Sequence, residues 1–188
     1  MPAENVKCKF AKVGSFLLKA ADGDQWSFTG TASTPTLDRQ GDTVDPQGAK
    51  FTLPLPLLLQ HDDAQPVGHI VSANVSKNGI VVAGKITEPT ADMPPGLASR
   101  LREAWTSIKS GLIRGLSIRF IPLEFAPNKA GGFDITAWDW LELSLVTIPA
   151  NADAGVSSFK SINPPIALRA RDGSFPLRTP HSFIRLRS

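Results

Sequence analysis

The sequence of 188 residues is poor in the residue types that build disulfides and metal centres. It holds one cysteine, Cys8, which excludes an internal disulfide and a cysteine-rich metal site. Tyrosine is absent, and the only histidines are His61, His69 and His181. So few histidines argue against a metal site with several imidazole ligands. We therefore expect no metal ion.

Long hydrophobic runs are also missing. No stretch is apolar over the roughly 20 residues that a membrane helix needs. The first ten residues carry Glu4, Lys7 and Lys9 and no apolar segment of the kind found in signal peptides. We expect a soluble protein of a reducing compartment, with no membrane partner.

Turn-forming residues are abundant instead. Sixteen Pro and 15 Gly accompany a hydrophobic content of 41%, which is enough for a core and favours many short strands. Apolar spacings of three and four predict one amphipathic helix at about 97–110. The remaining pattern predicts strands, so the expected fold is mainly β with helices (α+β), an antiparallel β-barrel. The strands are expected near 26–31, 67–75, 79–86, 115–125 and 133–148. An apolar run at 51–60 lies between the first and the second of them.

The end of the chain differs in charge from the rest. Residues 157–188 contain six Lys and Arg residues and one acidic residue, whereas residues 1–156 contain 14 basic and 16 acidic residues. Four prolines also interrupt the last segment. We expect residues 1–156 to form the barrel domain and residues 157–188 to form a basic tail outside it.

Three segments place a polar, chemically useful side chain at the border of an apolar run. His61 ends one such run. The alternation in Leu116–Phe120 turns Ser117 and Arg119 away from the core. The alternation in Leu141–Val146 buries Leu141, Leu143 and Leu145 and turns Glu142 and Ser144 outward.

A serine, a histidine and a carboxylate are the groups that acyl transfer requires. The hydroxyl attacks once a base accepts its proton, and a carboxylate orients the imidazole. The chain order His, Ser, Glu differs from the orders in chymotrypsin, subtilisin and the α/β-hydrolases, and no G-x-S-x-G motif surrounds Ser117. Residue spacing alone leaves open the alternative that these side chains are merely structural. Asp38, Asp42 and Asp45 lack a calcium-loop spacing and are expected to cap their own turns. His69 alternates with apolar neighbours and is expected to be a satisfied structural histidine.

Five sequence blocks, in order, resemble the tailed-phage prohead (capsid maturation) serine proteases, which are related to the herpesvirus assembly proteases. The resemblance covers roughly residues 28–154 and implies the antiparallel barrel of the herpesvirus enzymes. The blocks are TASTPTLDRQGD at 31–42, LQHD at 59–62, PVGHI at 66–70, GLIRGLSIRF at 111–120 and LELSLVTIPAN at 141–151.

The resemblance also implies roles for single residues. Ser117 matches the nucleophile, His61 the catalytic histidine, and Glu142 stands where the herpesvirus enzymes have a second histidine. Asp62 or Asp63 is an alternative third member. The herpesvirus enzymes use an Arg pair at the oxyanion, which this chain lacks after Glu142. Candidate oxyanion donors are therefore Arg119 and the backbone N–H groups of Ala150 and Asn151.

A member of this family would be a serine endopeptidase without a cofactor. Its expected substrates are the major capsid protein, scaffold segments and the enzyme itself, inside the procapsid in the host cytoplasm, and a homo-oligomer is compatible with the resemblance. One alternative is a non-catalytic assembly or scaffolding protein with the same barrel. A second is a nucleic-acid-binding module, against which the acidic body argues beyond a weak contact through the basic tail.

Overall fold

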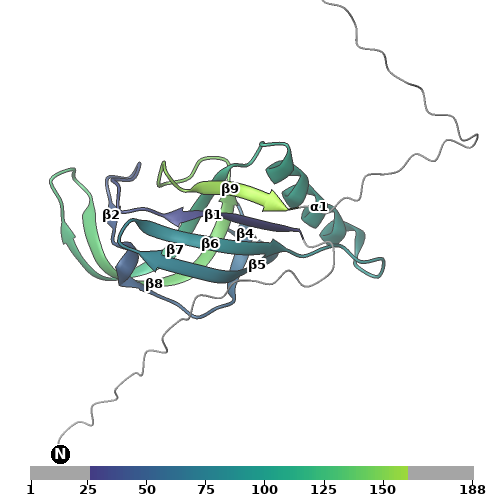
Figure 1. Cartoon of the computed structure of the whole chain (residues 1–188), viewed down its shortest axis with the longest axis horizontal. Helices are drawn as coiled ribbons and strands as arrows, with labels where there is room; N and C mark the ends of the chain where they lie inside the picture. Colours follow the sequence, from purple (N-terminus) through teal and green to yellow (C-terminus); the bar gives the residue numbers. More distant parts are fainter. Residues whose placement is uncertain (1–25, 161–188) are drawn as a thin grey trace, which may run out of the picture.

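The computed structural model describes residues 26–160 of the chain, and strands make up most of them (Figure 1). Within these residues there is one α-helix and one short 3-10 helix. The elements are β1 (Ser27–Ser33), β2 (Thr43–Val44), η1 (Pro46–Gly48), β3 (Ala49–Lys50), β4 (Leu55–Leu59), β5 (Asp62–Ser76), β6 (Gly79–Ile86), α1 (Pro95–Lys109), β7 (Gly115–Pro127), β8 (Phe133–Val146) and β9 (Gly155–Lys160).

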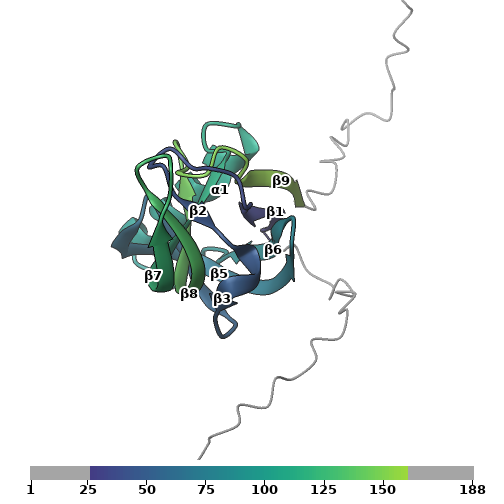
Figure 2. The ribbon, with the colours of Figure 1, turned by 90° about the vertical axis from the view of Figure 1, so that its left-hand side faces the viewer.

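The strands close into a barrel, which Figure 2 shows nearly end-on. The ring runs β8-β4-β5-β6-β1-β9-β7 and returns to β8, so its seven strands leave no gap. The neighbours pair antiparallel, except that β4 lies parallel to β8. The short strands β2 and β3 add parallel pairs to the far part of β8. The expected β-barrel with a helix is confirmed, and the parallel pairs that β8 forms with β2, β3 and β4 depart from a purely antiparallel arrangement.

The interior of the barrel is filled by large apolar side chains. Trp138 and Trp140 of β8 are fully buried, with their ring centroids 5.9 Å apart. Each indole N–H donates to a backbone carbonyl, of Asp45 and Glu142 respectively. Burial of aromatic side chains of this size supplies much of the hydrophobic free energy that holds such a barrel together.

Helix α1 lies at the end of the barrel where β9 finishes (Figure 1). Its buried face is the one that the spacing predicts, and Trp105 stacks on Trp26 with 5.5 Å between ring centroids. The helix begins at Pro95, where proline's missing N–H costs nothing. Leu112 continues the apolar spacing four residues after Ile108, but it lies beyond the helix end and is exposed. No helix among the described residues is both long and apolar enough to span a bilayer.

Strand β9 is an element that the sequence pattern did not indicate. It pairs with β1 from Thr31↔Gly155 to Ser27↔Lys160 and touches β7 at Gly115. The sheet therefore continues four residues past position 156, where the expected barrel domain ended. The rest of the expected basic tail, residues 161–188, lies outside the described residues.

Candidate active site

A β-bulge at Leu141 determines which side chains of β8 reach the outer face of the barrel. Phe120 pairs with Trp140, but the next residue of β7, Arg119, pairs with Glu142. Leu141 is therefore an extra residue, and it is 40% exposed. The expectation that Leu141 is buried is wrong, because a bulged residue leaves the regular alternation of the strand.

Beyond the bulge the outer face carries the polar side chains. Leu143 and Leu145 point into the core, whereas Glu142 and Ser144 lie opposite Arg119 and Ser117 of β7. Directly paired residues share a face of the sheet, so these four side chains form one cluster. Glu142 and Ser144 are nevertheless only 2% and 0% exposed.

The turn between β4 and β5 contacts this part of β8. Leu59 pairs with Asp62, which leaves Gln60 and His61 as the two loop residues, and both have positive φ (54° and 58°). Two positive φ values are the requirement of the tight type I′ hairpin turn. The Gln60 N–H donates to the carbonyl of Leu145, and the His61 N–H donates to Ser144 Oγ at 3.1 Å. The turn thus brings the imidazole to Glu142.

Glu142 makes the central contacts of the site. Its Oε1 lies 2.7 Å from His61 Nδ1, and its Oε2 accepts a hydrogen bond from Ser144 Oγ at 2.7 Å. Arg119 Nε lies 3.4 Å from Oε1. A carboxylate at Nδ1 selects the tautomer that carries its proton there, so Nε2 is left as the basic nitrogen.

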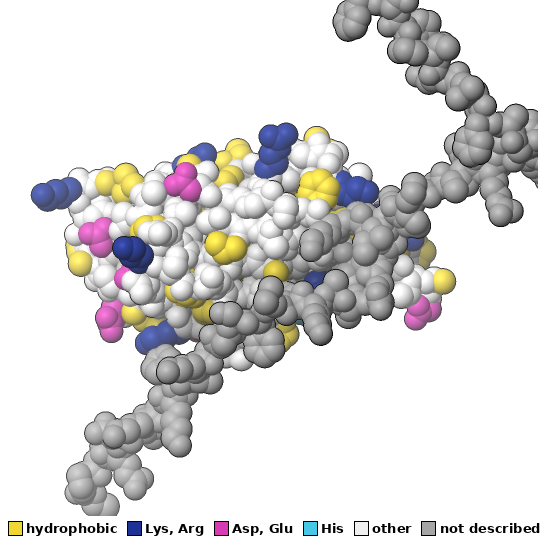
Figure 3. All heavy atoms as spheres, in the orientation of Figure 1, with side chains coloured by type: hydrophobic (Ala, Val, Ile, Leu, Met, Phe, Trp, Pro, Cys, Tyr) yellow, Lys and Arg dark blue, Asp and Glu magenta, His cyan; other side chains and the backbone are white. Residues whose placement is uncertain are grey.

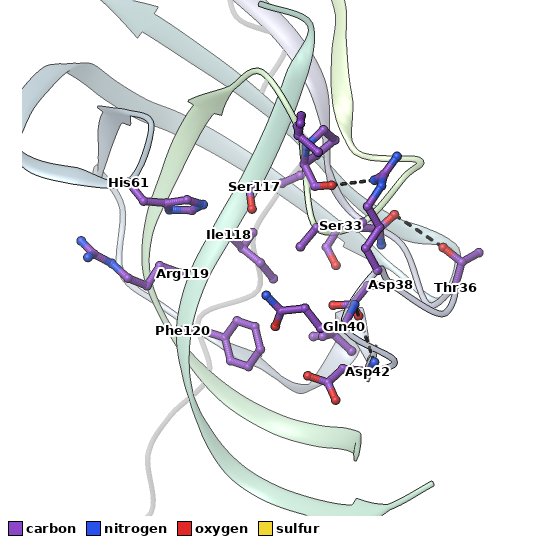
Figure 4. A pocket seen from close by; sticks show the side chains of 17 residues that line it. Ser33, Thr36, Asp38, Gln40, Asp42, His61, Ser117, Ile118, Arg119 and Phe120 are labelled. Carbon is purple, nitrogen blue, oxygen red and sulfur yellow. Dashed lines mark hydrogen bonds between the residues drawn. The ribbon is translucent and has the colours of Figure 1, made fainter. Parts of the chain in front are cut away.

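Ser117 and His61 line the same cavity of about 460 Å³ (Figure 4). In this view the imidazole points toward the Ser117 hydroxyl from the neighbouring turn. Ser117 is 6% exposed. Among the hydrogen bonds of residues 26–160, none joins the side chains of Ser117 and His61. Catalytic contacts of this kind often tighten only when substrate binds. A hydroxyl, an imidazole and a carboxylate from three strands or turns therefore converge.

The two aspartates considered as third members are engaged elsewhere. Asp62 accepts hydrogen bonds from the Ala64 N–H and from Gln65 Nε2, both 2.8 Å. These bonds lower the pKa of Asp62 below its usual value. Asp63 forms an ion pair with Arg119. The carboxylate at the imidazole is that of Glu142.

Arg119 also lines the cavity, but its guanidinium points away from Ser117 (Figure 4). Its hydrogen bond to Asp63, and then the nearby charge of Glu142, raise the pKa of the guanidinium above its already high value. This position favours a role in holding Glu142 over contact with an oxyanion. The expectation for Arg119 as an oxyanion donor stays a prediction.

The loop after β8 contributes Ala150 and Asn151 to the lining of the cavity. Arg39 holds it by donating from Nη1 to the carbonyl of Pro149 and from its backbone N–H to that of Ala150. The N–H groups of Ala150 and Asn151 donate to no acceptor within the part of the chain that is described. Gly115 lets the loop approach β7, because a Cβ there would lie 2.7 Å from Pro149 Cδ.

The acidic turn on the rim of the cavity satisfies its own backbone. Asp38 accepts hydrogen bonds from the N–H groups of Gln40 and Asp42, and Asp45 accepts one from Gln47. The expected capping of their own turns is confirmed for Asp38 and Asp45. It is wrong for Asp42, whose side chain accepts a hydrogen bond from the distant Phe133 N–H at 2.7 Å. Within residues 26–160, no cluster of three or more His, Cys, Asp or Glu side chains could hold a metal ion.

Sequence reasoning gave no role to Ser144 or to the Arg119–Asp63 pair. Ser144 follows Glu142 by two positions, so the alternation places both on one face, and this was the available signal. Asp63 belongs to another strand, and nothing in its local sequence indicates Arg119 as a partner. His69, expected to be a satisfied structural histidine, is exposed.

Comparison with known proteins matches most of the chain. The family model described as caudovirus prohead serine protease covers residues 28–164. The capsid polyprotein of Pseudomonas phage PAJU2 is 48% identical over 147 residues, which are 78% of this chain and 22% of that protein. The prohead protease of Escherichia phage T5 is 28% identical over 142 residues, 71% of this chain and 63% of that protein.

Two herpesvirus protease structures are similar in outline. The KSHV protease in complex with a hexapeptide phosphonate inhibitor gives a TM-score of 0.46 at 19% identity, covering 70% of this chain and 63% of that one. The varicella-zoster virus protease gives 0.45 at 11%, covering 71% and 64%. The chain thus spans less than two thirds of the length of each of these four proteins.

Proposed function

The chain belongs to the caudovirus prohead serine protease family, and from this premise we propose that it is a serine endopeptidase acting in phage capsid maturation. The observation that carries the proposal is the 2.7 Å contact between His61 Nδ1 and the buried Glu142, with Ser117 on the same cavity. Together these residues supply a nucleophile, a base and an orienting carboxylate.

In the proposed reaction, Ser117 Oγ attacks the carbonyl carbon of a peptide bond while its proton passes to His61 Nε2. Glu142 stabilises the imidazolium that results. The C–N bond then breaks as Nε2 returns the proton to the leaving amine, and an acyl-enzyme remains. Water, deprotonated by the same nitrogen, attacks the ester, and the Ser117 hydroxyl is restored with release of a carboxylic acid.

The negative charge on the tetrahedral intermediate requires hydrogen-bond donors. The backbone N–H groups of Ala150 and Asn151 are the best candidates, because both residues line the cavity and these N–H groups are not used within the described residues. Arg39 would fix their position through its two hydrogen bonds to the same loop. Arg119 is the weaker candidate, since its guanidinium is bound to Asp63.

The proposed substrates are segments of the major capsid protein and of its scaffold, and the chain itself. The support is that the relatives bear the names capsid polyprotein and prohead protease. We place the reaction inside the prohead, in the host cytoplasm. Residues 161–188 of the basic tail would dock the enzyme on scaffold or coat protein. The enzyme would also remove this tail by cleaving its own chain.

Co-expression with the coat protein tests the proposal. Cleavage products are identified by mass, with mapping of the new N- and C-termini. Ser117→Ala and His61→Ala should each abolish the products. Matched controls are Ser72→Ala and His69→Ala on β5, which remove a hydroxyl and an imidazole outside the site and should leave the product pattern unchanged. Products that persist with Ser117→Ala would overturn the proposal.

The same experiment addresses the non-catalytic alternative. A scaffolding protein with this barrel would assemble with coat protein and yield no products from the unaltered chain. A nucleic-acid-binding module would instead show an affinity that falls steeply with salt. Figure 3 argues against the latter for the face it shows, because Lys and Arg side chains are scattered there among acidic and apolar ones.

A further inference from the structure

Ser144 is a fully buried serine whose hydrogen bonds both go to the candidate catalytic groups. Its Oγ donates to Glu142 Oε2 at 2.7 Å and accepts from the His61 backbone N–H at 3.1 Å. Its exposed fraction is 0%. A hydroxyl can act as donor and acceptor at once, and here it joins the carboxylate to the turn that carries the imidazole.

We propose that Ser144 is a positioning residue for the reaction: it fixes the Glu142 carboxylate and the His61 turn relative to each other. The inference rests on the proposed serine-protease function and adds to it a residue that contacts no substrate. Three features of the site lead to it, which concern the carboxylate, the turn and the neighbouring nucleophile.

The first feature is the orientation of the carboxylate. Oε1 of Glu142 is placed by His61 and by the nearby Arg119 Nε, whereas Ser144 is the only partner of Oε2 within residues 26–160. Without that hydroxyl, one oxygen of a buried carboxylate would have no hydrogen bond, which is unfavourable. The group would rotate toward other donors, and the contact with Nδ1 would lose its geometry.

The second feature is the attachment of the turn to β8. Consecutive N–H groups of the turn, those of Gln60 and His61, donate to Leu145 and to Ser144. The first of these bonds joins two backbone groups and needs no side chain, whereas the second depends on the hydroxyl of Ser144. Loss of the hydroxyl therefore removes the acceptor of the His61 N–H, and the turn is attached to β8 less firmly at the residue that carries the imidazole.

The third feature is the position of Ser144 beside the nucleophile. Ser144 and Ser117 are directly paired across β7 and β8. Side chains of such a pair are close enough to compete for the same partner. Because the Ser144 hydroxyl is already bound to Glu142, the Ser117 hydroxyl is the one available to the imidazole.

The rate at which a small fluorophosphonate modifies Ser117 tests the inference without a known substrate. In this reaction the Oγ–P bond forms, the P–F bond breaks, fluoride leaves and His61 takes the hydroxyl proton. Ser144→Ala should lower the rate constant about 10- to 100-fold, by analogy with residues that orient the ligands of metal sites through hydrogen bonds. With a peptide substrate that the unaltered chain cleaves, kcat should fall by a similar factor while KM stays nearly constant.

Two controls separate positioning from general destabilisation. Val82→Ala removes buried volume from β6, away from the site, and should lower the melting temperature without changing the rate. Ser144→Thr and Ser144→Val differ only in a hydroxyl against a methyl group, so their ratio reports the hydroxyl even if both crowd the site. The Thr variant should react at least 10-fold faster than the Val variant.

The outcomes are distinct. Equal rates for the unaltered chain and Ser144→Ala, or for the Thr and Val variants, would overturn the role of Ser144 and leave the protease proposal intact. If Ser117 of the unaltered, folded chain is not modified at all, the proposed function itself fails, and the role of Ser144 with it.

Discussion

At the scale of single residues, Glu142 is the group on which most of the site depends. It is buried, it contacts His61 and Ser144, and it lies next to a guanidinium. We expect Glu142→Gln to lower kcat for coat-protein cleavage by about two to four orders of magnitude, because an amide neither selects the tautomer nor stabilises the imidazolium. Quantified product formation over time measures the effect.

The control for this substitution is Glu124→Gln, which changes an exposed carboxylate on the same pair of strands. It should retain full activity. Glu142→Gln activity within a factor of three of the unaltered chain would contradict the orienting role. Thermal unfolding of both variants shows whether a loss of folded protein contributes.

Asp62 provides a pH-dependent prediction. Its hydrogen bonds from Ala64 and Gln65 lower its pKa in the folded state, so they stabilise the fold above the unfolded pKa and lose this effect as the pH falls through the folded value. We expect Asp62→Asn to lower the melting temperature at pH 7 and to lower it less at an acidic pH, because the difference fades as the pH falls through the folded pKa and Asp62 becomes neutral. An equal difference at the two pH values would contradict this.

The sequence singles out the proposed reacting residues because of their rarity or their surroundings. Only three histidines exist, and His61 alone ends an apolar run inside a block that resembles a family motif. The partners of these residues could not be predicted in the same way. Whether Glu142 or a neighbouring aspartate meets the imidazole depends on the positions of β5 and β8 in space, which the local pattern does not contain.

At the scale of elements, the bulge in β8 is the decisive feature. A regular strand cannot turn both Trp140 and Leu143 into the barrel interior, because residues three apart point to opposite faces. One extra residue between them removes the conflict, and Leu141 is that residue. The sequence shows that the apolar residues of this strand fall out of alternation, but the sequence does not show which residue bulges.

Alanine substitutions distinguish the bulged strand from a regular one. Leu141→Ala should change the free energy of unfolding by less than about 0.5 kcal/mol, as at other surface positions. Leu143→Ala, in the core, should cost about 2–5 kcal/mol. Urea unfolding of both variants measures the two values, and similar costs would mean that Leu141 is buried after all.

At the scale of the whole molecule, β9 completes the ring. It lies between β1 and β7 and is the last strand of the described part of the chain. A chain that ends at residue 154 loses this strand and exposes the edges of its two neighbours, whereas a chain that ends at residue 160 keeps it. We expect cooperative thermal unfolding from the chain that ends at residue 160 and none from the chain that ends at residue 154.

Comparable melting curves for the two truncations would show that the barrel does not need β9. The result also bears on the basic tail, because any function assigned to the tail must be tested with a chain that keeps residues 155–160. Sequence reasoning placed the end of the barrel too early because β9 is short and mixes apolar with polar residues, so its strand character depends on its pairing with β1.

The parallel pairing of β4 with β8 has a consequence for timing. The imidazole comes from the turn after β4, yet its partners are about 80 residues further along the chain. A growing polypeptide on the ribosome therefore carries the histidine long before anything exists to orient it. In the proposed mechanism, Ser117 would therefore have no oriented base until synthesis has passed β8.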